Sequence, residues 1–316
     1  MSFRLIRPIT VTPAMLTYSN IAEADYAEWN IGTSYSEGGR CIVSAQHKVY
    51  EALTSVTGGS SPEVDVLATP PKWVLVGSTN KYKMFDNRLS EQTSQPGFIR
   101  VTIKPGTVVN AIYLGNISGT EVTVVSTVPL ADSGSPTTYT KTINLLAEAS
   151  EYSPFVADAY DYAFEEIATR SDIVEFDIPP YMQQSITITI KYQGGTAKCG
   201  VFMCGLSLDV GTMLYGGQLT LVDYSVGKEA DEYGDNDVIE RGWAKEARVR
   251  VLLKNTRLDI FYRFLSTYRA TPVIWVMSQN FSCMIVYGLW SGPSFSLNYP
   301  EHTFVELELK GLTANN

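Results

Sequence analysis

The residue types that most often carry enzyme chemistry are scarce in this chain. Histidine occurs only twice, as His47 and His302, and neither forms part of an HExxH or HxH pattern. A histidine-rich metal site is therefore excluded. A Ser-His-Asp triad would have to use one of these two residues, and neither lies near a GxSxG turn. We expect no catalytic residue, no metal site and no cofactor, so the chain is predicted not to be an enzyme.

Cysteine spacing gives no sign of metal or redox chemistry. The four cysteines, Cys41, Cys199, Cys204 and Cys283, form no CxxC pair. Thiols of this kind usually pack as small apolar side chains in the interior. We therefore expect free, buried cysteines and no disulfide framework.

Acidic residues are abundant, but their number alone identifies no site. The chain has 33 Asp and Glu against 24 Lys and Arg, a net charge of −9. This excess disfavours nucleic-acid binding, which needs a basic surface. The most acidic segment, 228–240, lacks the glycine and glutamate offsets of a calcium-binding EF-hand, so we interpret it as a solvated linker. The adjacent Glu165 and Glu166 and the lone Asp177 define no acid–base pair.

Length and hydropathy indicate ordinary globular domains. The 316 residues are 45% hydrophobic and 18% charged, which is enough apolar material for two or three cores. The first ten residues contain no apolar segment typical of a signal peptide. Apolar stretches reach about five residues, whereas a membrane helix requires about 20. We expect the chain to be made in the cytoplasm and not to insert into a membrane.

The elements that must position any functional residue are mostly short β-strands. Alternating or β-branched runs are separated by Gly, Pro, Asn and Ser turns, a pattern typical of sandwiches and barrels. In one run, Ile186, Ile188 and Ile190 alternate with polar residues, as on a half-buried sheet. The predicted strands lie at 97–103, 108–114, 121–128, 173–178 and 185–192.

One segment, at about 257–269, has the spacing of an amphipathic helix. Pro272 ends it, because the residue before a proline avoids the helical conformation. A weaker candidate at 157–167 is equally compatible with a loop. The residues of the first helix that we expect to be buried against the C-terminal sheet are Leu258, Phe261 and Leu265.

The chain divides into three predicted segments, 1–75, 76–217 and 218–316. The first holds few strand-length runs, the second carries the regular strands, and the third combines strands with the helix. We predict a mainly β protein, with a small aromatic N-terminal module, a β-sandwich or barrel, and a C-terminal β-rich domain with one helix.

The aromatic residues of the first segment follow a distinctive order. Trp29 and Tyr35 precede a double-glycine turn; a short hairpin ending near Tyr50 follows, and Trp73 closes the segment. This order resembles that of small chitin-binding-type carbohydrate-binding modules. The resemblance implies that the four rings bind carbohydrate, since flat rings can stack on the apolar faces of sugars. A domain this small also needs aromatic residues for its core, so packing is the alternative role.

The second segment resembles a jelly-roll sandwich of the galactose-binding or discoidin-like kind. Such sandwiches often hold a calcium ion near an early aspartate, which here is Asp86. The alternative for Asp86 and Asn87 is the opening of a turn. The segments that carry the resemblance are 81–87, 92–93, 99–103, 111–117, 185–192, 199–205 and 208–216.

The layout of residues 73–87, the sandwich and residues 241–312 together resembles tail-associated virion proteins of bacteriophages and prophages. The resemblance implies a structural, non-enzymatic component of a tail tip, baseplate or fibre attachment, located in the virion. Its implied partners are other phage tail proteins, further copies of itself in a homo-oligomer, and a host surface glycan. The alternative is a carbohydrate-binding, lectin-like protein that acts in host recognition.

Overall fold

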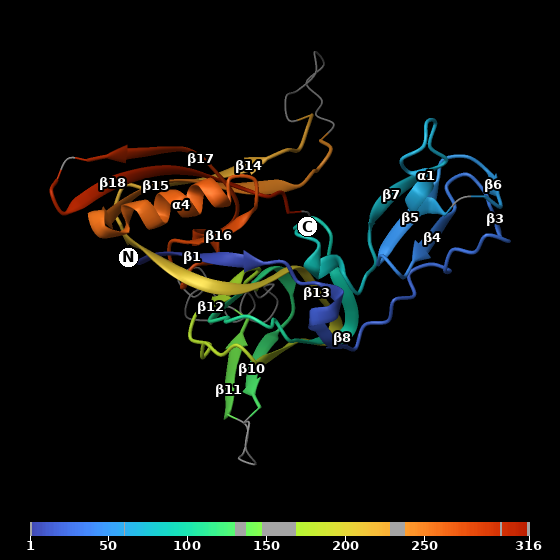
Figure 1. Ribbon diagram of the computed structural model, residues 1–316, viewed down its shortest axis with the longest axis horizontal. Coiled ribbons are helices and arrows are strands. Elements are labelled where there is room, and N and C mark those ends of the chain that lie inside the picture. The colour runs from blue at the N-terminus through green and yellow to red at the C-terminus, as the bar shows by residue number, and fades with distance from the viewer. Residues whose placement is uncertain are drawn as a thin grey trace, which may run out of the picture.

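The computed structural model describes residues 2–59, 61–129, 137–146, 169–227, 238–297 and 299–314. Strands make up 55% of it and helices 10%, so the predicted mainly β fold class with one long helix is confirmed. The weaker helix candidate at 157–167 lies outside the described residues, as does most of the acidic segment, 228–237. Figure 1 shows a large body of packed sheets and a smaller unit to its right.

A single long strand, β13 (Ser185–Met213), organises the large body. It pairs first with β10 and β8, then with β9, and finally with β1 and β15, always antiparallel. Its register shifts between Lys191 and Thr196, around Gly194, whose positive φ of 81° a glycine adopts without strain. The sandwich strands are β2 (Leu16–Ser19), β8 (Thr93–Ile103), β9 (Ala111–Ser118), β10 (Glu121–Val128), β11 (Thr137–Asn144) and β12 (Ile173–Glu175).

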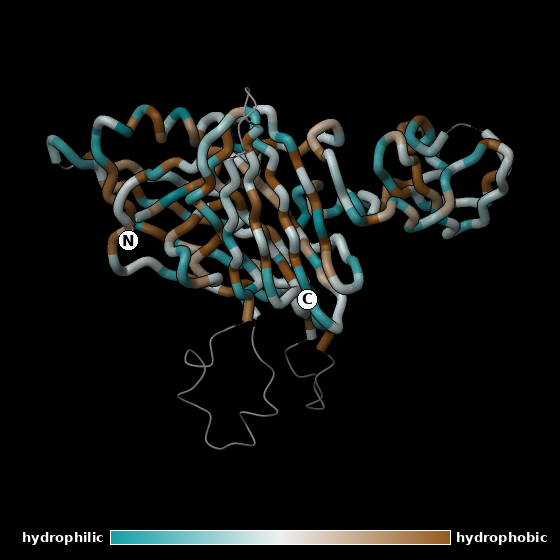
Figure 2. Tube along the Cα trace, turned by 90° about the horizontal axis from the view of Figure 1, so that it is seen from below, coloured by the Kyte–Doolittle hydropathy of each residue, from teal (hydrophilic) through white to brown (hydrophobic). Residues whose placement is uncertain are grey.

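Alternation along these strands builds the sandwich core. Ile186, Ile188 and Ile190 of β13 are fully buried, as their spacing predicts, and they pack with the inward residues of β8 and β10. The alternation of apolar and more polar residues appears as changing colours along the strands in Figure 2. Strand β9 closes the core from the other side through Ile112 and Leu114.

The C-terminal strands, called the C-terminal sheet below, continue the same 13-stranded hydrogen-bonded sheet through β1, and the long helix α4 (Leu258–Thr267) covers them. Phe261 and Leu265 are buried as predicted, together with Phe264, whereas Leu258 is only half-buried because it begins the helix. The strands are β14 (Gln218–Asp223), β15 (Trp243–Lys254), β16 (Val273–Val276), β17 (Ile285–Ser296) and β18 (His302–Gly311). Short 3-10 turns lie at Pro13–Met15, Lys83–Phe85, Asn255–Arg257 and Ser282–Met284.

The first strand of the chain, β1 (Ser2–Ile9), belongs to the large body although it lies within the segment 1–75. It is inserted between β13 and β16. Phe3 and Leu5 enter the core beneath α4, while Ile6 enters a separate core shared with β9 and β17. The small sheets therefore begin only after β2.

The small unit contains one two-stranded and one three-stranded sheet, in the orders β3-β6 and β4-β5-β7. Figure 1 shows it projecting from the body, and the chain enters it before β3 and leaves it after β7. Its elements are β3 (Ser34–Tyr35), β4 (Arg40–Val43), β5 (Lys48–Ala52), β6 (Val56–Thr57), α1 (Pro62–Asp65) and β7 (Trp73–Ser78).

Candidate functional site

The four aromatic residues predicted to bind carbohydrate come together in the small unit. Trp73 and Tyr50 are buried in its core, and Tyr35 packs edge-on against Trp73 with ring centres 5.1 Å apart. Trp29 and Tyr35 line the same cluster but are only half-buried. Tyr50 and Trp73 therefore have the alternative role, packing in the core. Trp29 and Tyr35 are the two rings that a sugar could reach from solvent.

A buried thiol and phenol complete this aromatic core. Burial raises the pKa of Cys41 to about 11, with a smaller contribution from Glu28. Burial also raises the pKa of Tyr50, whose hydroxyl donates to Gln46 Oε1 at 2.9 Å. Both groups are therefore neutral at physiological pH, and neither is poised as a nucleophile.

Hydrogen bonds to Glu23, which we call the Glu23 latch, hold the small unit against the sandwich. Glu23 Oε1 accepts hydrogen bonds from His47 Nδ1 at 2.9 Å and from Thr79 Oγ1 at 2.8 Å. The His47 ring also stacks on Tyr82, with centres 3.8 Å apart. Because a carboxylate only accepts, His47 must carry a proton on Nδ1 in this arrangement. Asp25 Oδ2 accepts a hydrogen bond from the backbone N–H of Asn80 at 2.6 Å. The segment by which the chain enters the small unit is thus bonded to the segment by which it leaves.

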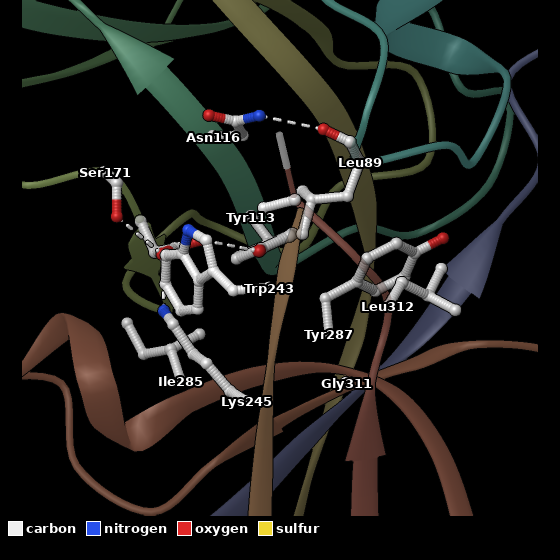
Figure 3. Close-up of a pocket in the computed structure, with 12 residues that line it drawn as sticks. Leu89, Tyr113, Asn116, Ser171, Trp243, Lys245, Ile285, Tyr287, Gly311 and Leu312 are labelled. Carbon is white, nitrogen blue, oxygen red and sulfur yellow. Dashed lines mark hydrogen bonds and ion pairs between the residues drawn. The ribbon is translucent and has the colours of Figure 1, made fainter. Parts of the chain in front are cut away.

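A small pocket lies where the sandwich meets the C-terminal sheet (Figure 3). Its centre is Asp172, which accepts from Tyr113 Oη at 2.7 Å, from Lys245 Nζ at 2.6 Å and from Ser171 Oγ at 2.9 Å. Tyr113 comes from β9 and Lys245 from β15, so the carboxylate bridges the two halves. The Trp243 indole lies near the ammonium group, with 5.9 Å between Nζ and the ring centre.

The pocket contains an ion pair that is largely shielded from solvent. The Lys245 and Asp172 side chains are 18% and 7% exposed. Burial, followed by the charge of Asp172, raises the pKa of Tyr113 well above its ordinary value. Lys245 Nζ also donates to the Ser282 carbonyl at 2.8 Å. The cavity measures about 60 Å³, room for about two waters and not for a sugar ring. The cluster therefore clamps the two halves together.

Sequence reasoning missed this clamp. Its hydrogen bonds join residues 59 and 73 positions apart. A lone aspartate, lysine and tyrosine at such separations carry no local signal, and the chain offers 33 acidic residues among which to choose.

Asp86 lies in a turn. Its Oδ1 accepts from the Arg88 backbone N–H at 3.0 Å, and Asn87 has a positive φ of 65°. Burial raises the pKa of Asp86, an effect partly offset by its hydrogen bonds. Among the described residues, no group of three His, Cys, Asp or Glu side chains is placed to hold a metal ion.

Comparison of the chain with models of protein families, with curated proteins and with solved structures found no match. Within the part of the chain that the structure describes, no helix is long and apolar enough to span a membrane.

Proposed function

We propose that this chain is a non-enzymatic structural component of a bacteriophage tail, in the tip, the baseplate or a fibre attachment. It assembles there with other tail proteins and with further copies of itself, and it contacts a host surface glycan. Its place of action is the virion.

The observation that carries this proposal is the way in which three β units are joined. Strand β13 runs from the sandwich into the C-terminal sheet without interruption. The Asp172–Lys245 pair bridges the same two halves, and the Glu23 latch holds the small unit. A rigid body with one projecting module suits a spacer that presents a contact surface at a fixed distance.

Exposed apolar residues on an edge strand support assembly. Strand β14 pairs with β15 on one side only within the described sheet, and Leu221 is 65% exposed on it. The strand lacks the lysine, proline or bulge that commonly protects a free edge. A neighbouring chain in an assembly would cover both its backbone and its leucines.

The proposal is tested by locating the chain in phage particles. Antibodies raised against the purified protein are applied to phage particles released, after prophage induction, from the organism that encodes it. We expect gold label at one end of the tail in electron micrographs, and the intact chain among proteins of purified particles. Particles that lack the chain while the lysate contains it would overturn the proposal.

The half-buried Trp29 and Tyr35 favour a second candidate, a lectin-like protein that acts free of a particle. Trp29→Ala and Tyr35→Ala would each abolish glycan binding by the purified chain in that case. A free lectin would be monomeric and absent from particles, whereas a tail component would be found in them.

A further inference from the structure

We infer that the outer face of the sandwich sheet formed by β11, β10, β13 and β8 is a binding surface for a neutral polysaccharide. This surface is distinct from the aromatic cluster of the small unit. It does not depend on the place of the chain in a particle, because it concerns binding by the purified protein.

Strand register places an array of hydroxyl side chains on this face. Residues paired across antiparallel strands share a face, and the intervening residues point into the core. Eight of the nine central positions are Thr or Ser, and the ninth is Val125. The three rows across β11, β10 and β13 are Thr142-Thr123-Thr189, Thr140-Val125-Thr187 and Thr138-Thr127-Ser185.

The array has a regular spacing, and its open hydrogen-bonding capacity lies mainly on β11, because the hydroxyls of Thr123, Thr187, Thr189 and Ser185 already have partners. Adjacent strands are about 4.8 Å apart and alternate residues about 6.8 Å apart along a strand. Each threonine offers a hydroxyl beside a methyl group, as a sugar ring offers hydroxyls beside C–H bonds. On β11, the exposed hydroxyls of Thr138, Thr140 and Thr142 have no hydrogen-bond partner among the described residues.

Two exposed aromatic rings border the array on the same face. Tyr18 of β2 pairs with Thr102 of β8, which pairs in turn with Thr187. Phe98 of β8 pairs with Lys191. Tyr18 is 50% exposed and Phe98 is 43% exposed. Threonine is common in strands because of its β-propensity, but that propensity does not account for the exposed Tyr18 ring, or for Phe98, whose ring centre lies 5.6 Å from the Arg100 guanidinium.

The distribution of charge on this face favours a neutral ligand. None of the nine central positions carries a charge. Arg100 lies at the margin, where its Nε donates to Thr189 Oγ1 at 3.3 Å. Lys191 and Glu121 lie at the end of the array and neutralise each other at 2.7 Å. The face thus has no cationic cluster for an anionic glycan or a nucleic acid. It also lacks the large apolar residues at its centre that protein interfaces use as anchors.

Affinity electrophoresis of the purified full chain tests this assignment. Native gels are cast with hydroxyethyl cellulose, mannan or dextran, and with polygalacturonate as an anionic reference. Pull-down on insoluble cellulose and chitin extends the panel. We expect retardation or capture by at least one neutral polysaccharide and none by polygalacturonate.

Matched variants assign the binding to this face. Thr140→Lys inserts a charge into the array, and Tyr18→Ala removes a bordering ring. Each should weaken binding about fivefold or more, as the loss of contacts to a sugar does. Thr212→Lys makes the same change at an exposed position elsewhere on β13 and should leave binding unchanged. Circular-dichroism melting curves confirm that all variants are folded.

Each outcome of these experiments either supports or overturns the inference. Binding that falls for Thr140→Lys and Tyr18→Ala but not for Thr212→Lys supports the inference. Absence of binding across the neutral panel overturns it, as does binding that survives both face variants. Self-association abolished by Thr140→Lys, without polysaccharide binding, would instead assign the face to a second copy of the chain.

Discussion

Asp86 shows how one turn residue can affect stability. Burial, the largest effect, raises its pKa above the ordinary value, while hydrogen bonds to the Arg88 backbone and the Ser78 side chain lower it. The folded protein therefore holds this proton more tightly than the unfolded chain. The contribution of Asp86 to the free energy of unfolding consequently falls as pH rises above about 4.

We predict that Asp86→Asn removes this pH-dependent loss, because the amide oxygen can still accept the Arg88 N–H. Urea denaturation at pH 4 and pH 7 measures the free energy of unfolding of both proteins. The free energy of unfolding of the variant, relative to that of the wild type, should be higher at pH 7 than at pH 4. A difference that is the same at both pH values would contradict this account.

Thiol reactivity should distinguish the four cysteines. Burial raises the pKa of Cys41 to about 11 and that of Cys204 to about 12, and Cys199 is also fully buried. Cys283 is exposed, contrary to the expectation that all four are buried. Titration with Ellman's reagent should modify one thiol in the native protein and four in guanidinium chloride. Cys283→Ser should remove the native reaction altogether; residual native labelling of that variant would show that a buried thiol is accessible.

At the scale of elements, α4 covers one face of the C-terminal sheet through three residues. Phe261→Ala should cost about 3–5 kcal/mol of unfolding free energy, because it leaves a cavity against that sheet. Its neighbour Tyr262 is 63% exposed, so Tyr262→Ala should cost less than about 1 kcal/mol. Equal losses in chemical denaturation would mean that the helix rests on a different face.

The clamp between the halves should behave as a coupled pair. Lys245→Met leaves the Asp172 carboxylate buried without its ammonium partner, which should cost about 3–5 kcal/mol. Adding Asp172→Asn should recover part of this loss, because the uncompensated charge is gone. A double-mutant cycle by urea denaturation measures the coupling, and strictly additive losses would show that the two groups do not act together.

The local pattern of apolar residues predicts strands and helices well, but it predicts poorly which strands pair with one another. The alternation of Ile186, Ile188 and Ile190 correctly predicts a half-buried strand, and the apolar spacing at 257–269 correctly predicts a helix. The membership of β1 in the central sheet has no such signal. Its neighbours β13 and β16 lie about two hundred residues or more away, and nothing in Ser2–Ile9 encodes that pairing.

The same limit applies to the candidate site. The order of aromatic residues placed Trp29, Tyr35, Tyr50 and Trp73 in one cluster, but their exposure depends on how the small sheets fold around them. The clamp and the threonine array depend on register between distant strands, which composition does not encode. The array becomes visible only once β8, β10, β11 and β13 are aligned, and the clamp only once β9 and β15 meet at Asp172.

At the scale of the whole molecule, the edge of β14 that has no partner strand among the described residues should mediate self-association. Leu219 and Leu221 project from it into solvent, and antiparallel pairing with a second copy would cover them. We predict concentration-dependent oligomers in light scattering that Leu221→Lys abolishes. Leu67→Lys changes a leucine of the small unit that is more exposed, at 86% against 65%, and serves as the control. A protein that remains monomeric at all concentrations would contradict the prediction.

The 29-residue length of β13 has a mechanical consequence. Hydrogen bonds in an antiparallel pair lie perpendicular to the strands. A pull that separates the sandwich from the C-terminal sheet therefore acts along the covalent backbone of β13 and loads its bonds to β8, β9 and β1 in shear, all at once. Tension between these two parts is borne by many bonds in parallel, whereas a hinge between independently folded units would yield one contact at a time.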